Sequence, residues 1–308
     1  MSAQAKPDQT ALAQALALPA AAHIGQRIAK RVLAEQIASL PGTTAADKRL
    51  ATDLLAELHW LAALKPTTCG LAVWQTETHD YLEIAVLHAV VHAQIRPSSG
   101  RKASSRSPAT ATQTSKSQSR LIELIHRAIP YPVVLIISQS GAEGEAESDT
   151  EGGKCAAQLS LAHKRLSQSA SSAVVLEHIV TTKSIALHAD STPAICQFLQ
   201  YIAFNSAAGT SINTAVSTLR DLYARYSDWL HAVEALAASE HTGQFQVSAS
   251  ESQAKSRRQA LANFEKINQQ LISLRNQASK ESQLGSRAAL NQQIAALMAQ
   301  RLALQSKL

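Results

Sequence analysis

The sequence predicts an α+β protein: a mixed β-sheet flanked by helices, with a long C-terminal helical extension. Three stretches support this class. Residues 133–137 are all branched or aliphatic, which is typical of a strand covered on both faces. Residues 81–95 place apolar side chains at alternate positions, which favours another strand. Residues 253–308 contain no proline and repeat aliphatic side chains at helical spacing, which favours helices.

The N-terminal part is predicted to hold a frayed segment and two helices. Residues 1–15 are polar and are expected to be frayed. A first helix is expected over residues 23–40, because their apolar side chains recur at helical spacing. Thr44 is a suitable N-cap for a second helix over residues 45–64, whose leucines share one face.

The body of the fold is expected in a domain over residues 16–240. Within it, residues 81–95 can also be interpreted as an alanine-rich helix, and this alternative stays open. Residues 121–129 have a helical apolar face, which Pro130 and Pro132 interrupt before the aliphatic run begins. Further strands are expected at residues 71–74, 155–166 and 173–181, and further helices at residues 193–205 and 212–239.

Two polar insertions interrupt this domain. Residues 96–119 are rich in Ser, Thr and Gln and carry basic but no acidic side chains. Residues 141–153 carry acidic but no basic side chains. Neither segment has enough apolar surface to bury, so both are predicted to be disordered. Residues 241–252 are predicted to be a linker to the C-terminal segment.

The C-terminal segment, residues 253–308, carries two apolar stripes. The first runs from Leu261 to Leu274, and the second has a 3–4 spacing. Residues 279–286 interrupt the register between them, so a kinked coiled coil and a helical hairpin both remain open. The second stripe is the candidate partner-binding surface, and its residues are Leu290, Ile294, Leu297 and Leu304.

The balance of charge permits acidic partners. The formal net charge is +6 and the pI is about 9.3, with the bases concentrated in the C-terminal segment and in residues 96–119. Lys and Arg side chains bind phosphates by releasing condensed counterions, but neither region interleaves aromatic side chains for base stacking. The candidate nucleic-acid-binding residues are Arg257, Arg258, Lys266 and Arg275.

His88 and His92 form the sharpest metal-like pattern. On a helix these two side chains share a face and could bind zinc together. On a strand they lie about 13 Å apart at a rise of ~3.3 Å per residue, which is too far for one ion. Structural histidines are therefore the favoured interpretation, and no metal or other cofactor is expected.

Glu83, together with Lys164 and Arg165 on another expected strand, is the constellation that could suggest catalysis. A carboxylate beside a lysine can support metal-dependent phosphodiester cleavage, but that chemistry needs a second acid. No Glu-x-Lys triplet starts at Glu83, because Ile84 and Ala85 follow it. Whether the chain is an enzyme stays open, and a non-enzymatic role is favoured.

Six segments carry a family resemblance. They are Leu18-Pro19 with the segment after it, HWLAALKPTT, LEIAVL, IPYPVVLII, LAHKR and KESQLGSRAALNQQIAAL. In this order they resemble an uncharacterised bacterial family, a domain of unknown function. Its genes often stand beside restriction–modification methyltransferases and helicases in phage-defence loci. The resemblance implies an α+β body with a C-terminal helical extension and a cytoplasmic accessory role. It carries over no catalytic residue.

The leading expectation is therefore a non-enzymatic accessory protein of a DNA restriction–modification or phage-defence system. It would act through protein contacts of its C-terminal helices, with a methyltransferase, a helicase or a second copy as partner. The alternatives are a nucleic-acid-processing enzyme with a degenerate nuclease-like core and a DNA-binding protein. No membrane segment is expected, because no apolar run approaches the ~18–20 residues that span a bilayer.

Overall fold

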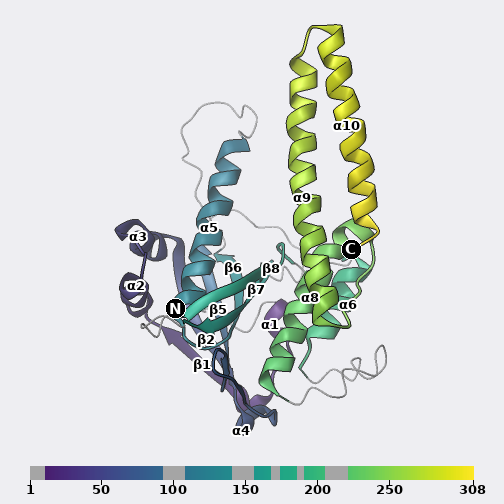
Figure 1. Cartoon of the computed structure of the whole chain (residues 1–308). Helices are drawn as coiled ribbons and strands as arrows, with labels where there is room; N and C mark the ends of the chain where they lie inside the picture. Colours follow the sequence, from purple (N-terminus) through teal and green to yellow (C-terminus); the bar gives the residue numbers. More distant parts are fainter. Residues whose placement is uncertain (1–10, 93–107, 141–155, 168–173, 186–190, 205–220) are drawn as a thin grey trace, which may run out of the picture. The chain divides into compact units, whose positions relative to one another are not determined.

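The computed structural model describes residues 11–92, 108–140, 156–167, 174–185, 191–204 and 221–308 (Figure 1). The chain forms two compact units. The first comprises Met1–Thr192 and Leu199–Leu230, and the second comprises Pro193–Phe198 and His231–Leu308. The predicted α+β class is confirmed, because the first unit contains a mixed sheet flanked by helices and helices follow at the C-terminus.

A six-stranded mixed sheet forms the centre of the first unit. Its strand order is β1-β2-β5-β6-β7-β8. β5 and β6 pair in parallel, and every other neighbouring pair is antiparallel. A two-stranded sheet, β3 (Trp74–Gln75) with β4 (Asp80–Tyr81), is separate from it. The six strands are β1 (His23–Ile28), β2 (Leu55–Leu64), β5 (Ile84–His92), β6 (Val133–Ser140), β7 (Ala157–Leu166) and β8 (Val174–Thr181).

Three helices pack on one face of this sheet and enclose the main apolar core. They are α2 (Lys30–Ser39), α3 (Ala45–Leu54) and α5 (Pro108–Ala128). Their buried leucines and isoleucines contact the inward side chains of β2, β5 and β6. The other helices are α1 (Ala11–Ala15), the 3-10 helix η2 (Ala20–Ala22), α4 (Pro66–Cys69), α6 (Pro193–Ile202), α8 (Leu222–Thr242), α9 (Glu251–Lys280) and α10 (Leu284–Gln305).

The helix–proline–strand prediction around residues 121–138 is confirmed. α5 ends at Ala128, and β6 begins at Val133 directly after the two prolines. Proline lacks an N–H and disfavours the α region for the residue before it, so the helix cannot continue. β6 lies between β5 and β7, and residues 133–138 are all buried. This part of the chain is the centre of the sheet.

A tyrosine of α8 extends the β6–β7 pair by one step. The hydroxyl of Tyr226 accepts a hydrogen bond from the Ala162 N–H at 2.8 Å and donates one to the Val133 carbonyl at 2.8 Å. The strand register between β6 and β7 stops at Val134 and Leu161, so the phenol takes the place of the next rung. Tyr226 is fully buried, which makes this bridge part of the core.

Two helix predictions are wrong over part of their length. Residues 23–28 form edge strand β1, and only the second half of the expected helix 23–40 is helical, as α2. Gly25 has a φ of 65°, a conformation that ends helical geometry. The expected helix 45–64 stops at Leu54, and β2 follows at once. β2 pairs with β1 and β5, and this tertiary pairing overrides the local helix propensity of its Leu and Ala residues.

The strand prediction for residues 81–95 is confirmed over residues 84–92 as β5, and the alternative of an alanine-rich helix is wrong there. Tyr81 belongs to the separate strand β4, and residues 93–95 lie outside the described residues. α5 begins at Pro108, so it extends into the range 96–119 that the sequence assigns to a disordered insertion. The earlier part of that insertion, through residue 107, lies outside the described residues, as does the whole acidic insertion 141–153.

The C-terminal extension is a helical hairpin. α9 and α10 lie side by side as an antiparallel pair joined by a short connection at residues 281–283 (Figure 1). Two contacts between the helices define this pairing: the Arg301 guanidinium lies 3.4 Å from the Asn268 side-chain oxygen, and Arg275 lies 3.8 Å from the Met298 sulfur. The kinked coiled coil that the sequence left open is therefore excluded.

The predicted N-cap at Thr44 is confirmed, and it supports a stability prediction. Asp47 completes a capping box with Thr44 and accepts hydrogen bonds from Arg120 of α5 at 2.9 and 3.0 Å. Arg120 holds the pKa of the Asp47 carboxyl far below its usual value. Asp47→Ala is expected to lower the free energy of unfolding by about 2 kcal/mol, because the cap and the ion pair are lost together.

Urea unfolding of the purified variants checks this value. Asp53→Ala is the matched control, because Asp53 lies on the same helix and is exposed. Its effect should stay within about 0.5 kcal/mol. Equal stability of both variants would contradict the role of Asp47.

Candidate interaction surface

α9 buries one face within the second unit. Ala260, Phe264, Ile267 and Leu271 are buried, and the Phe264 ring lies 4.3 Å from the His241 ring at the end of α8. These residues follow a helical 3–4 spacing, and all but Ala260 belong to the first stripe seen in the sequence. The hairpin is therefore attached mainly through the buried face of α9, whereas α10 contains no buried residue and adds a hydrogen bond from Gln305 to the His241 carbonyl.

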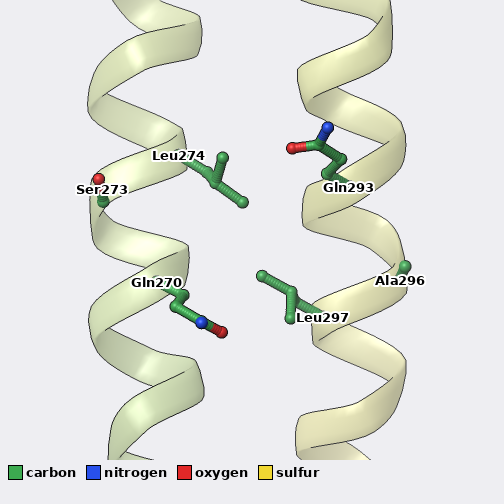
Figure 2. Close-up of a pocket in the computed structure, with 6 residues that line it drawn as sticks. All are labelled: Gln270, Ser273, Leu274, Gln293, Ala296 and Leu297. Atoms are coloured by element: carbon green, nitrogen blue, oxygen red, sulfur yellow. The ribbon is translucent and has the colours of Figure 1, made fainter.

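The four candidate partner-binding residues face into the hairpin. Leu290, Ile294, Leu297 and Leu304 are half-buried on α10. Figure 2 shows Leu297 pointing toward α9, where Leu274 points back at it. A groove of about 470 Å³ lies beside this pair, lined by Gln270, Ser273, Leu274, Gln293, Ala296 and Leu297. The stripe thus contributes mainly to helix–helix packing.

A second stripe on α10 is exposed. It has the spacing of a heptad seam, with successive steps of four and three residues. Leu284, Met298 and Leu302 leave 73%, 42% and 69% of their surfaces exposed. The stripe consists of Leu284, Ala288, Asn291, Ala295, Met298 and Leu302 and is named the outer stripe below. Met298 lies at the edge of the stripe, because its sulfur is 3.8 Å from Arg275 of α9. Its spacing is visible in the sequence, but alanines and an asparagine weaken the apolar signal.

Two of the four candidate nucleic-acid-binding bases are engaged within the second unit. Arg257 is buried and donates a hydrogen bond to the Gln246 carbonyl at 2.5 Å. Arg258 forms ion pairs with Glu234 at 3.0 Å and with Glu251. Their positive charge is therefore used in packing and pairing.

The other two bases, Lys266 and Arg275, are exposed. Lys280 and Arg287 at the tip of the hairpin are exposed as well, whereas Glu265 and Glu281 are the acids of this outer part. The outer part of the hairpin therefore has a net positive charge.

The residues considered for catalysis are held in separate contacts. The Glu83 carboxylate pairs with Lys65 at 2.8 Å. The buried Lys164 amine donates to the carbonyls of Ile129 and Tyr131 at 2.8 and 2.5 Å. Arg165 lies 3.7 Å from Glu177 at the edge of the sheet. Each candidate thus has a structural partner of its own.

The two candidate metal-binding histidines lie at different depths on β5. His88 is buried, with its Nε2 atom 2.7 Å from the Ser138 hydroxyl, whereas His92 is exposed at the end of the strand. Within the ranges that the structure describes, no three His, Cys, Asp or Glu side chains are grouped so that they could hold a metal ion.

A polar row on the sheet escaped prediction. Glu57 and His59 are 2.9 Å apart on β2, and the His59 ring lies 6.4 Å from the His88 ring on β5. His88 connects this pair to Ser138 on β6. The row crosses three strands, and its members lie up to 81 positions apart in the printed numbering, so no local sequence spacing marks it. The hydrogen bonds satisfy polar groups inside the sheet layer.

These features define an α+β sheet protein that carries a C-terminal helical hairpin with an exposed apolar stripe. A family model described as a domain of unknown function (DUF4391) matches residues 16–300, and the chain belongs to this family. No curated protein matches the chain, and no solved structure matches it. A search of the described helices for a stretch long and apolar enough to cross a membrane finds none.

Proposed function

We propose that this protein is a non-enzymatic accessory protein that binds another protein through the outer stripe of α10. The observation that supports this proposal is the composition and exposure of α10: its charged side chains are two arginines, and Leu284 and Leu302 of the outer stripe leave 73% and 69% of their surfaces exposed. A helix that is apolar on more than one face is normally covered on each of them. The outer stripe is therefore expected to be covered by another helix.

The occupant of this seam is an amphipathic helix of the partner protein. From Leu284 to Leu302 the stripe extends about 27 Å at 1.5 Å per residue, which matches a partner helix of about five turns. Asn291 lies at the centre of the stripe, where a buried asparagine sets the register of a coiled coil. Arg287 is exposed and directly precedes Ala288 of the stripe, whereas Arg301 contacts Asn268 of α9. An acidic residue should therefore flank the apolar face of the partner helix near Arg287.

A second copy of the chain fits this seam less well. Both copies would bring the same net positive charge to the interface, and like charges at the flanks of a coiled coil disfavour pairing. The family resemblance suggests the class of partner: a methyltransferase or helicase of a DNA restriction–modification or phage-defence system in the cytoplasm.

DNA binding is the second candidate, because Lys266 and Arg275 are exposed on the same hairpin. Phe264 is the only aromatic residue between residues 251 and 308, and it is buried, so a stacking contact with bases has no support. Contacts to phosphates alone would be weak and strongly dependent on salt.

The test is capture of partners from the native host with the purified chain, followed by mass spectrometry and a binding titration with the purified partner. Leu284→Glu combined with Leu302→Glu is expected to weaken binding by about a hundredfold, since two charges enter an apolar seam. Gln292→Glu combined with Gln300→Glu adds the same charge to the same helix outside the stripe. This control should bind like the unmodified chain.

The outcomes separate the classes of function. Equal affinities of the two double variants would refute the outer stripe as the binding surface. A dimer in light scattering that the Leu284→Glu and Leu302→Glu changes convert to a monomer would replace the foreign partner with a second copy. Salt-sensitive binding of duplex DNA that Lys266→Ala and Arg275→Ala abolish would favour the second candidate.

A further inference from the structure

The helices over the sheet of the first unit leave a hollow open. It lies between α2 and the segment that follows α5, and its volume is about 470 Å³. Trp60 of β2 and Ala85 and Leu87 of β5 line it from the sheet, and residues 128–131 form one wall. The hollow is named the α2–α5 pocket below. Its volume lies in the range of small-molecule sites, about 300–1,000 Å³.

The lining of the α2–α5 pocket is mainly apolar and aromatic. The Trp60 indole N–H already donates to the Ala62 carbonyl at 2.9 Å, so the ring offers the pocket an apolar surface. Val32 and Tyr131 also line the pocket and leave 48% and 40% of their surfaces exposed, so it opens to solvent beside apolar side chains. This lining favours a ligand that contains an apolar ring.

The charge beside the pocket is compensated. The Arg27 guanidinium, which contributes to the lining, pairs with the Glu57 carboxylate at 3.1 Å. Gln26 and Gln36 add side-chain amides, which are neutral hydrogen-bond donors and acceptors. An ionised ligand would lose its hydration here without gaining a counter-charge, so an uncharged ligand is favoured.

Lys164 holds the wall of the pocket that residues 128–131 form. The buried Lys164 amine donates to the carbonyls of Ile129 and Tyr131, on either side of Pro130. The proline ring fixes its own φ angle, so this segment has little freedom. A preformed wall reduces the entropy that ligand binding must overcome.

We propose that the α2–α5 pocket binds a small uncharged molecule with an apolar ring and at least one hydrogen-bonding group. The site lies entirely in the first unit, and it is independent of the outer stripe of α10. The competing occupant is an apolar side chain of a protein partner, and the experiment below separates the two.

The probe is N-phenyl-1-naphthylamine, an uncharged aromatic fluorophore, titrated into the full chain. Saturable binding at one site with increased emission is expected. Val32→Trp places a bulky ring at the pocket and should weaken binding by about tenfold or more. Val73→Trp is the matched control, because Val73 is 47% exposed, equal to Val32 within one per cent, and does not line the pocket. This control should leave the affinity unchanged.

The charge of the ligand is tested with 8-anilinonaphthalene-1-sulfonate, which has the same ring system and a negative charge. It should bind more weakly than the uncharged probe. Tighter binding of the anion, or an equal loss of affinity in both tryptophan variants, would overturn the proposal. Absence of saturable binding of the uncharged probe would overturn it as well. If the uncharged probe does not bind and Val32→Trp weakens the binding of a protein partner, the pocket accepts a side chain of that partner instead of a small molecule. Thermal melting confirms that both variants fold.

Discussion

Lys164→Ala is expected to lower the free energy of unfolding by about 3 kcal/mol. The hydrogen bonds of this amine go to two backbone carbonyls and not to a charged side chain. The substitution leaves the carbonyls of Ile129 and Tyr131 without their donor and opens a cavity beneath the proline segment. Burial lowers the pKa of Lys164, but a neutral amine also donates hydrogen bonds, so the contact persists in either state.

Two further variants separate the contributions to this effect. Lys164→Met keeps most of the buried stem and should cost about 2 kcal/mol, the part due to the carbonyls. Arg165→Ala changes the adjacent residue, whose side chain is 40% exposed, and should cost less than about 1 kcal/mol. Urea unfolding monitored by circular dichroism provides these values. If Lys164→Ala were as stable as Arg165→Ala, the anchoring role of Lys164 would be wrong.

His126 should make the protein sensitive to mild acid. It is fully buried on α5, with its Nε2 atom 3.1 Å from the Ser160 hydroxyl. Burial, and then the nearby Lys164, lower the pKa of His126 well below its ordinary value of 6.5. As the pH falls below 6.5, His126 therefore takes up a proton in the unfolded chain but stays neutral in the folded chain. Stability should decrease by at most about 1.4 kcal/mol per pH unit in that window.

Unfolding measurements between about pH 7.5 and pH 5.5 test this slope. His126→Gln is the informative variant, because the amide is neutral and can still bond to the Ser160 hydroxyl. It should flatten the pH dependence relative to the unmodified chain, since the other histidines are common to both proteins. Parallel slopes would mean that the pKa of His126 is the same in the folded and unfolded states, and would contradict the prediction. The contribution of Asp47 is present above its ordinary pKa and is lost only at lower pH, outside this window.

Strands were predictable where branched apolar residues follow one another without a break. β6 has such a run, and β7 and β8 end close to the predicted positions. β2 was missed because residues 55–64 are mostly Leu and Ala with polar interruptions, a composition that also suits a helix. Its strand state depends on pairing with β1 and β5, which lie elsewhere in the sequence. β1 was missed because its apolar residues also fit a helical spacing, whereas Gly25 adopts a positive φ that ends helical geometry.

The surface of the hairpin was harder to predict than its helices. Leucines at 3–4 spacing indicate a seam but do not say whether the chain itself or a partner covers it. Arg257 and Arg258 looked like free bases because Glu234 and Gln246 approach them only in the folded unit. The pocket beside Trp60 combines residues from four separate segments, so its existence depends on the tertiary fold.

The Tyr226 bridge has a consequence for dissecting the chain. The centre of the sheet is complete in sequence at Thr181, but the phenol that joins β6 to β7 arrives more than forty residues later. A fragment that ends before α8 would expose the Ala162 N–H and the Val133 carbonyl at the middle of the sheet. Those two unpaired backbone groups would be able to form hydrogen bonds with a strand of another chain. A soluble fragment of the sheet therefore has to include the residues through Leu230 that complete the first unit.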